Sequence, residues 1–251
     1  MYSQKLPAVR HITLLTNFHN GPYIVNPSSP LVYFQIKAMI IGVEANIGAG
    51  KTTLITNLKQ VLLQKYGIES IAVPEPIAKW TSTPAGNLLS LFGDAKKEYS
   101  FTAQSLIMST MAYQRTNLPP APVILLERSL ESSTQVFQKA LKNDGYLTPL
   151  QDYVLTEMYQ AMSPLSPPLN GIIYLKIDPT TAHLRTQSRA KEGDKKITLD
   201  YLRTLDTYCI EMIKASDKDI LTLDATEDPE VLSEKAGKWI EHKMFSGDVI
   251  N

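Results

Sequence analysis

A glycine-rich turn between an apolar segment and a helical segment is the feature that most restricts how this 251-residue chain can fold. Residues 39–44 are mostly apolar, residues 45–53 read Ala-Asn-Ile-Gly-Ala-Gly-Lys-Thr-Thr, and residues 51–65 have a helical period. A strand, such a turn and a helix, in this order, form a phosphate-binding loop, or P-loop. A chance glycine-rich turn is the alternative, but the agreement of all three segments argues against it. The sequence therefore predicts an α/β domain with a phosphate site after its first strand.

The residues of this turn have separate chemical tasks. Gly48 and Gly50 let backbone N–H groups point at phosphate oxygens, and the N-terminus of the following helix adds its dipole. Lys51 brings a positive charge to the β- and γ-phosphates, and Thr52 offers its hydroxyl to Mg²⁺. Ala45 replaces the first glycine of the standard pattern, so we expect its φ to be negative and its methyl group to face away from the nucleotide. The ATP-binding residues predicted in this turn are Asn46, Ile47, Gly48, Ala49, Gly50, Lys51, Thr52 and Thr53.

Short apolar runs alternate with longer helical segments over the rest of the chain, the pattern of a parallel sheet with helices on both faces. Proline clusters fall just before two of the apolar runs, where a helix has to end. We expect one domain over residues 39–251 with a five-stranded parallel sheet. The predicted strands cover residues 39–44, 70–73, 123–126, 171–177 and 220–223, and the predicted helices cover 51–65, 101–116, 131–142, 150–161, 179–189, 199–215 and 229–243.

Composition argues against several classes of protein. The chain has 25 Lys and Arg against 25 Asp and Glu, and no strong basic stripe, so we expect no nucleic-acid partner. No apolar run reaches the roughly 18 residues of a membrane span. Cys209 is the only cysteine, and the four histidines show no metal-ligand spacing with it. Small-molecule partners and a reducing compartment, the cytoplasm, are therefore expected.

The first 38 residues differ from the rest because they contain no Asp or Glu and include a turn-like Asn-Pro-Ser-Ser-Pro at 26–30. Three interpretations stay open. We favour an irregular or dispensable extension. A mitochondrial transit peptide ranks second, because arginine is scarce and no clear amphipathic helix is present. In the third, Met39 is the start of the working protein.

A carboxylate follows the second predicted strand. A P-loop alone indicates only a nucleotide, and the Asp-x-x-Gly and Asn-Lys-x-Asp patterns of GTPases do not occur. Pro-Glu-Pro at 74–76 places Glu75 at the carboxyl edge of the sheet, where ligands of open α/β folds bind, and Trp80 follows. Glu75 is a candidate general base for an attacking hydroxyl. Taken alone, these residues fit more simply a solvated glutamate beside a core tryptophan.

A second charged cluster follows the third predicted strand at the same edge. Glu127 is a candidate to hold Mg²⁺ through water, and Arg128 a candidate to clamp the reacting oxygens. An internal ion pair is the alternative.

A basic segment follows the strand that ends at 177. Arg185, Arg189 and Lys191 run into Gly193 and Asp194, which indicates a helix and then a loop. This arrangement is typical of a short basic lid that closes over a transferring phosphoryl group. A solvated helix face is the alternative.

Together these motifs resemble the deoxynucleoside kinase family, which includes deoxycytidine, deoxyguanosine, mitochondrial thymidine and insect multisubstrate kinases, and the pattern is most similar to the insect enzyme. The resemblance implies a P-loop kinase fold, Mg²⁺-dependent transfer from ATP to the 5′-hydroxyl of a deoxynucleoside in nucleotide salvage for DNA synthesis, and a homodimer formed through helices near 101–116 and 131–142. The likeness covers most of 39–223 and rests on residues 46–52, 75–76, 79–80, 101–104, 127–129 and 185–194.

The same resemblance implies individual roles. Glu75 resembles the general base and Arg128 its partner, with Lys51 as the third catalytic residue. Gln104 resembles the amide that pairs with the nucleobase and Phe137 the aromatic ring that stacks on it. The acceptor site implied in this way comprises Glu75, Trp80, Gln104, Ile107, Met111, Arg128, Ser133, Phe137 and Asp194. The donor site adds Arg185, Arg189, Asp224, Thr226, Glu227 and Asp228, and Thr52 and Glu127 are the implied metal ligands.

Some positions depart from the family pattern. Gly93 falls where a tyrosine that binds the 3′-hydroxyl is expected, and Gln187 replaces a lid arginine. Ile107 and Ser133 stand where purine- and deoxycytidine-preferring members place an Arg and an Asp. This pair resembles the thymidine-accepting branch, so we expect pyrimidine deoxynucleosides, thymidine or deoxycytidine, to be preferred.

Two other functions compete with this interpretation. A thymidylate-type nucleoside monophosphate kinase shares the fold but binds an extra phosphate, and the Glu-Pro pair and Gln104 argue against it. A non-catalytic P-loop subunit is the other. This alternative is disfavoured, because a protein without catalytic activity has no chemical reason to keep two carboxylates, an arginine and the phosphate-binding lysine at one edge of the sheet.

Overall fold

The computed structural model of the chain describes residues 14–16, 22–24, 34–35, 38–189 and 196–246. Lys191, Gly193 and Asp194 of the predicted lid lie outside the described residues. The first 38 residues, expected to be irregular, contain the strands β1 (Leu14–Thr16), β2 (Pro22–Ile24) and β3 (Phe34–Gln35), which pair in an antiparallel sheet of their own. None of the helices described has the length and apolarity that a membrane crossing requires.

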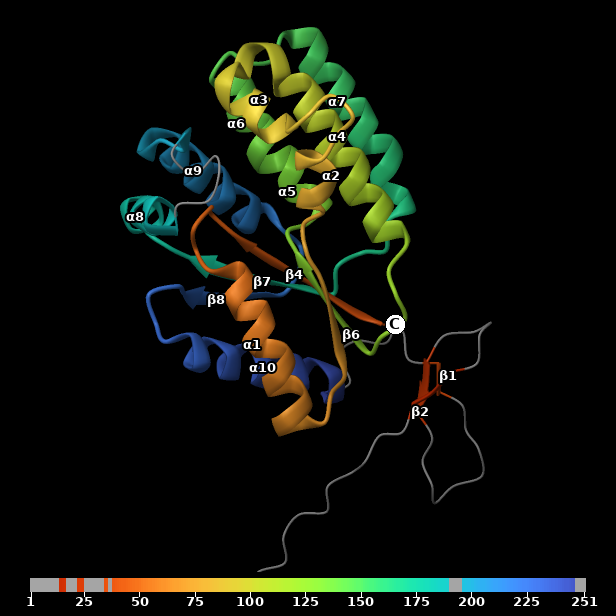
Figure 1. The fold of residues 1–251 in the computed structure, drawn as a ribbon. Coiled ribbons are helices and arrows are strands. Elements are labelled where there is room, and N and C mark those ends of the chain that lie inside the picture. The colour runs from red at the N-terminus through yellow and green to blue at the C-terminus, as the bar shows by residue number, and fades with distance from the viewer. Residues whose placement is uncertain (1–13, 17–21, 25–33, 36–37, 190–195, 247–251) are drawn as a thin grey trace, which may run out of the picture.

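Five parallel strands form the main sheet in the order β5-β6-β4-β7-β8, which confirms the predicted sheet (Figure 1). All seven residues of the central strand are buried, which explains its nearly continuous apolar run. The strands are β4 (Met39–Ala45), β5 (Ser70–Val73), β6 (Val123–Glu127), β7 (Gly171–Lys176) and β8 (Ile220–Asp224).

The seven predicted helical segments are all present. Helices α1 and α10 pack side by side along the sheet, while α4 and α7 belong to a separate helical layer (Figure 1). This layer has its own apolar cluster, which includes Trp80, Met108 and Leu155. The helices are α1 (Lys51–Tyr66), α4 (Lys96–Thr116), α7 (Pro149–Met162), α8 (Pro179–Arg189), α9 (Leu199–Ala215) and α10 (Pro229–Phe245).

The segment predicted as one helix over 131–142 has three parts. It consists of α5 (Leu130–Ser132), a π-helix η1 (Ser133–Gln138) and α6 (Lys139–Asn143). Three short elements were not predicted from the sequence. They are the helices α2 (Ile77–Thr81) and α3 (Leu88–Asp94) and the 3₁₀ turn η2 (Ser163–Leu165). Helices of five to seven residues show too little of a helical period to be recognised.

Candidate active site

A cavity of about 820 Å³ is lined by the P-loop, the carboxyl ends of β5 and β6, and helices around them. Its size and mixed polar and apolar lining suit small-molecule ligands. Asn46, Ala49, Gln104 and the residues of the loop 224–228 do not line it, and Asp194 lies outside the described residues. The predicted site residues that do line it are Ile47, Gly48, Gly50, Lys51, Thr52, Thr53, Glu75, Trp80, Ile107, Met111, Glu127, Arg128, Ser133, Phe137, Arg185 and Arg189.

The P-loop backbone requires glycine at two positions. Gly48 has φ 84° and Gly50 has φ 100°, both in the left-handed region. A Cβ at Gly48 would also come within 2.6 Å of the Ala182 carbonyl oxygen, so the loop packs directly on α8. Ala45 is different, because Arg128 alone among the described non-glycine residues has a positive φ. As expected, Ala45 has a negative φ, and it packs in the core.

Asn46 and Lys51 complete the loop in different ways. The Asn46 side chain donates to the Leu202 carbonyl at 2.8 Å and accepts the Ile47 N–H at 2.8 Å, so it fixes the loop shape from behind the cavity. Lys51 lines the cavity but is only 7% exposed. Burial, with the nearby Arg128 charge, lowers the pKa of Lys51 to about 8, although Glu75 and other carboxylates oppose the shift.

Glu75 and Arg128 meet in the cavity. The Arg128 Nε lies 3.0 Å from Glu75 Oε1, and its Nη1 donates to the Ala45 carbonyl at 2.9 Å. The guanidinium also lies 4.7 Å from the centre of the Phe137 ring. Arg128 adopts φ 68°, a conformation that costs a non-glycine residue about 1–3 kcal/mol and persists only where the surroundings hold it. The structure therefore places the candidate base against a rigidly held cation.

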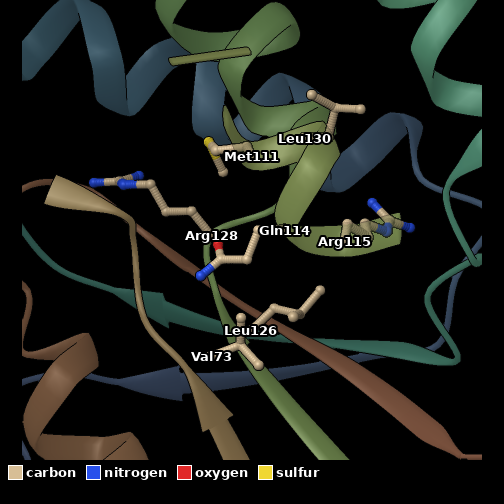
Figure 2. A pocket seen from close by; sticks show the side chains of 7 residues that line it. All are labelled: Val73, Met111, Gln114, Arg115, Leu126, Arg128 and Leu130. Carbon is tan, nitrogen blue, oxygen red and sulfur yellow. The ribbon is translucent and has the colours of Figure 1, made fainter. Parts of the chain in front are cut away.

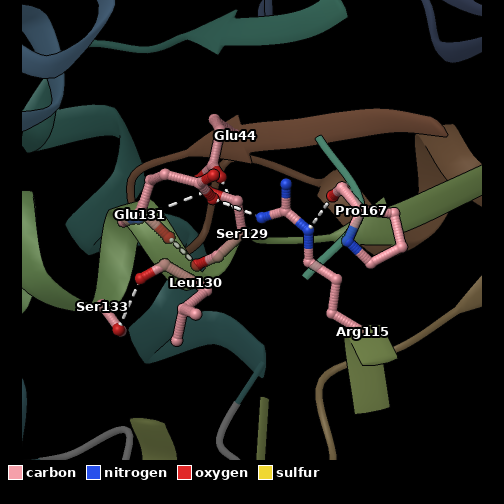
Figure 3. Close-up of polar contacts among 8 residues, drawn as sticks. Glu44, Arg115, Ser129, Leu130, Glu131, Ser133 and Pro167 are labelled. Atoms are coloured by element: carbon pink, nitrogen blue, oxygen red, sulfur yellow. Dashed lines mark hydrogen bonds and ion pairs between the residues drawn. The ribbon is translucent and has the colours of Figure 1, made fainter. Parts of the chain in front are cut away.

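A polar network supports the turn that follows Arg128 (Figure 3). The buried Glu44 carboxylate accepts the Ser129 N–H at 2.7 Å, and burial raises the pKa of Glu44. Arg115 donates to Glu131 Oε2 at 2.6 Å and to the Pro167 carbonyl at 2.8 Å. Sequence reasoning missed Glu44 and Arg115. Glu44 could have been recognised from the sequence, because it is a charged residue inside an otherwise apolar strand.

A small cavity of about 10 Å³, enough for about one water molecule, lies beside Arg128 (Figure 2). Gln114, also missed, lines it and donates to the Pro74 carbonyl at 2.9 Å. This bond fixes the loop that carries Glu75. Its lining residues are Val73, Met111, Gln114, Arg115, Leu126, Arg128 and Leu130.

The predicted nucleobase residues come from α2, α4 and the π-helix. Trp80 lines the cavity and donates its indole N–H to Thr110 at 2.8 Å. Ser133 and Phe137 both belong to the π-helix, a geometry that is frequent at functional sites. The Gln104 amide donates to the Ser133 carbonyl and is 2% exposed. In this structure Gln104 thus supports the π-helix instead of facing the cavity.

The two predicted metal ligands lie together. Thr52 donates its hydroxyl proton to Glu127 Oε1 at 2.7 Å, and both residues line the cavity. The described residues contain no group of three or more His, Cys, Asp or Glu side chains suited to a metal ion. A Mg²⁺ ion that arrives with a nucleotide needs only one or two protein oxygens beside phosphates and water, so Thr52 and Glu127 fit this ion.

The donor side is built from α8 and the loop after β8. Arg185 donates to the carbonyls of Ala49 at 3.4 Å and Ala225 at 3.1 Å, which links the P-loop to that loop. Asp224 accepts the Thr226 N–H at 2.9 Å, and Asp228 caps α10. These carboxylates shape the loop and do not line the cavity.

The five-stranded parallel sheet, the P-loop and the helices on both faces define a P-loop kinase fold. The chain belongs to the deoxynucleoside kinase family, whose model matches residues 41–244. It is 30% identical over 234 residues to deoxycytidine kinase 2 of Gallus gallus, covering 78% of this chain and 85% of that protein. It is 28% identical over 170 residues to mitochondrial thymidine kinase 2 of Homo sapiens, covering 67% and 62%, and 28% identical over 223 residues to human deoxycytidine kinase, covering 75% and 84%. The chain is therefore a nucleotide-binding kinase that phosphorylates nucleosides.

Proposed function

We propose that this kinase transfers the γ-phosphoryl group of ATP to the 5′-hydroxyl of a pyrimidine deoxynucleoside, thymidine or deoxycytidine, in nucleotide salvage for DNA synthesis. One observation carries the proposal. The Glu75–Arg128 pair, 3.0 Å apart, lines the same cavity as Lys51 and Thr52. A candidate base and a phosphate-binding lysine thus share one small-molecule site.

In the proposed reaction the acceptor's 5′-oxygen attacks the γ-phosphorus and ADP leaves. Glu75 accepts the hydroxyl proton, and Arg128 holds Glu75 in place. Lys51 neutralises the donor phosphates, while Arg185, which donates to the Ala49 carbonyl of the P-loop, and Arg189 both line the cavity. Mg²⁺, when bound at Thr52 and Glu127 with the nucleotide, offsets charge on the phosphate oxygens. Most of the rate enhancement then comes from positioning and electrostatics.

Support for a pyrimidine comes from the cavity walls. Ile107, Met111, Ser133 and Phe137 line the cavity, and none of the four is charged. Phe137 offers a ring face for stacking. Relatives named as deoxycytidine kinase and thymidine kinase point to the same class of base.

The test measures ADP release by the purified chain with ATP and Mg²⁺. Thymidine, deoxycytidine, deoxyadenosine, deoxyguanosine and thymidine monophosphate serve as separate acceptors. We expect turnover of a pyrimidine deoxynucleoside that falls by about 100-fold or more in Glu75→Gln, because the proton loses its acceptor. Glu98→Gln, an exposed glutamate on α4, is the matched control and should keep full activity.

Other outcomes identify the competing functions. Turnover of thymidine monophosphate alone would make the protein a nucleotide kinase. ATP binding without any turnover would make it a non-catalytic subunit.

We also propose a cytoplasmic homodimer. Exposed apolar side chains occur on two packed helices, Tyr113 on α4 and Leu150 and Tyr153 on α7, and the segment 130–143 has no comparable exposed side chain. The partner helix would then be α7 instead of the segment near 131–142. Sedimentation of the full chain tests the dimer, and cell fractionation of the full chain distinguishes the cytoplasm from mitochondria.

A further inference from the structure

One end of the cavity lies where the α3–α4 turn meets the start of α9. Gly93 and Lys96 line it from the turn, and Lys196 and Tyr201 line it from the α9 side. Two contacts join these segments. Lys196 Nζ lies 2.6 Å from Asp94 Oδ1, and Lys96 Nζ lies 4.6 Å from the centre of the Tyr201 ring. Each segment thus provides one lysine whose ammonium group contacts a residue of the other segment. These two contacts fix this wall of the cavity.

Lys196 fills the space that a side chain at position 93 would need. A Cβ built on Gly93 would lie 2.7 Å from Lys196 Cδ and 3.6 Å from Nζ. The φ of Gly93 is outside the left-handed region, so its backbone does not demand glycine. A side chain at position 93 would therefore meet the methylene chain of Lys196, which would have to move away.

The Lys196 ammonium retains donor capacity toward the cavity. An ammonium group has three N–H donors. Within the described part of the chain, Nζ contacts Asp94 at 2.6 Å and the Ser90 carbonyl at 3.5 Å, the second at the limit of a hydrogen bond. These two contacts with described residues leave at least one of the three donors for a ligand in the cavity that Lys196 lines.

We infer that Lys196 determines acceptor specificity by donating a hydrogen bond to the sugar 3′-hydroxyl. This inference rests on the proposed function. A 2′-deoxynucleoside has two hydroxyls, and the 5′-hydroxyl reacts at Glu75, so the 3′-hydroxyl is the sugar group left to recognise. The uncharged walls for the base come from α4 and the π-helix, which leaves the end at Gly93 and Lys196 for the sugar.

The test compares Lys196→Met with the wild-type chain on two acceptors, the best deoxynucleoside and its 2′,3′-dideoxy counterpart. Methionine keeps an unbranched stem over Gly93 and loses the ammonium. We expect KM for the deoxynucleoside to rise by about 10-fold or more, the effect of losing a charged hydrogen-bond donor, with little change in kcat. KM for the dideoxynucleoside should not change, and Lys196→Arg should restore part of the lost affinity. Lys97→Met, at an exposed position on α4 outside the cavity lining, is the matched control.

Equal losses on both acceptors, or no loss on either, would overturn the inference. A wild-type chain that turns over no nucleoside would instead contradict the proposed function, so the two failures are distinct. Gly93→Ala gives a second measure, because the added methyl group displaces Lys196. It should lower kcat/KM for the deoxynucleoside in the wild-type background and have no effect in Lys196→Ala. A loss of the same size in both backgrounds would show that Gly93 does not act through Lys196.

Discussion

Lys51 must be charged to bind phosphate, yet its position in the cavity disfavours the charge. Burial and the Arg128 charge lower its pKa from 10.5 to about 8, and the carboxylates of Glu75, Glu127 and Glu44 only partly oppose the shift. Bound phosphates add negative charge and favour the protonated lysine. Nucleotide binding and protonation of Lys51 are therefore linked.

This linkage predicts that KM for ATP rises as the pH increases through about 8, because the free protein then loses the Lys51 proton. Lys51→Met should have a higher KM with no such pH dependence. Between pH 8 and 10.5 the unfolded chain binds more protons at this residue than the folded protein, so the Lys51 contribution to the free energy of unfolding increases with pH. Initial rates and chemical denaturation on both sides of pH 8 test both statements. A pH dependence retained in Lys51→Met would assign it to another group.

At the scale of single residues, some contacts of the site could be predicted from the sequence and others could not. Lys51, Glu75 and Arg128 follow strands of one parallel sheet, so their meeting at its carboxyl edge follows from topology. The contact of Lys196 with Gly93 joins segments about a hundred residues apart and depends on side-chain packing, which no local pattern encodes. For Gln104, the local structure could be predicted from the sequence but the side-chain contact could not. Its place on a helix was predictable, but its bond to the π-helix was not.

At the scale of elements, the strands were predictable to within one residue at each end. The three inner strands β4, β6 and β7 are almost entirely buried, so each has a nearly continuous apolar run. Helix α4 begins five residues before its predicted start at 101, since its first residues, 96–100, are mostly polar and lack an apolar period. The π-helix inside 131–142 could not be predicted, because one changed hydrogen-bond register leaves the apolar pattern of so short a segment almost unaltered.

The Arg115 network joins elements and predicts a stability effect. Arg115→Met leaves the Pro167 carbonyl and the partly exposed Glu131 carboxylate without their partner, so we expect it to lower the free energy of unfolding by about 1–3 kcal/mol. Arg115→Met with Glu131→Gln should be less destabilised than the sum of the single changes, because no unpaired charge remains. Urea denaturation measures all three variants. Strict additivity would mean that the ion pair does not link α4 to α5.

At the scale of the whole molecule, the cavity brings together residues from Ile47 to Tyr201 and none of the described residues of 1–38. Strands β1 to β3 pair with one another and not with the main sheet. The described strands of the main sheet and the residues that line the cavity thus all come from positions after residue 38. The expected boundary at residue 38 rests on the absence of Asp and Glu before it and on the apolar run that begins at Met39, and it stays a prediction. The sequence could not show how the chain enters the sheet.

The way in which the chain leads into β4 at Met39 predicts which shortened chain keeps the activity and stability of the full chain. Met39 is buried, and its N–H donates to the Pro122 carbonyl at 2.9 Å. A chain that starts at Met39 would put a charged amino terminus at this buried position, which is costly. A chain of residues 37–251 keeps an ordinary peptide bond there. We expect it to match the full chain in kcat/KM and in unfolding midpoint, and the chain that starts at Met39 to unfold at lower urea concentration. Loss of activity in a folded 37–251 chain would instead show that the first residues contribute to catalysis.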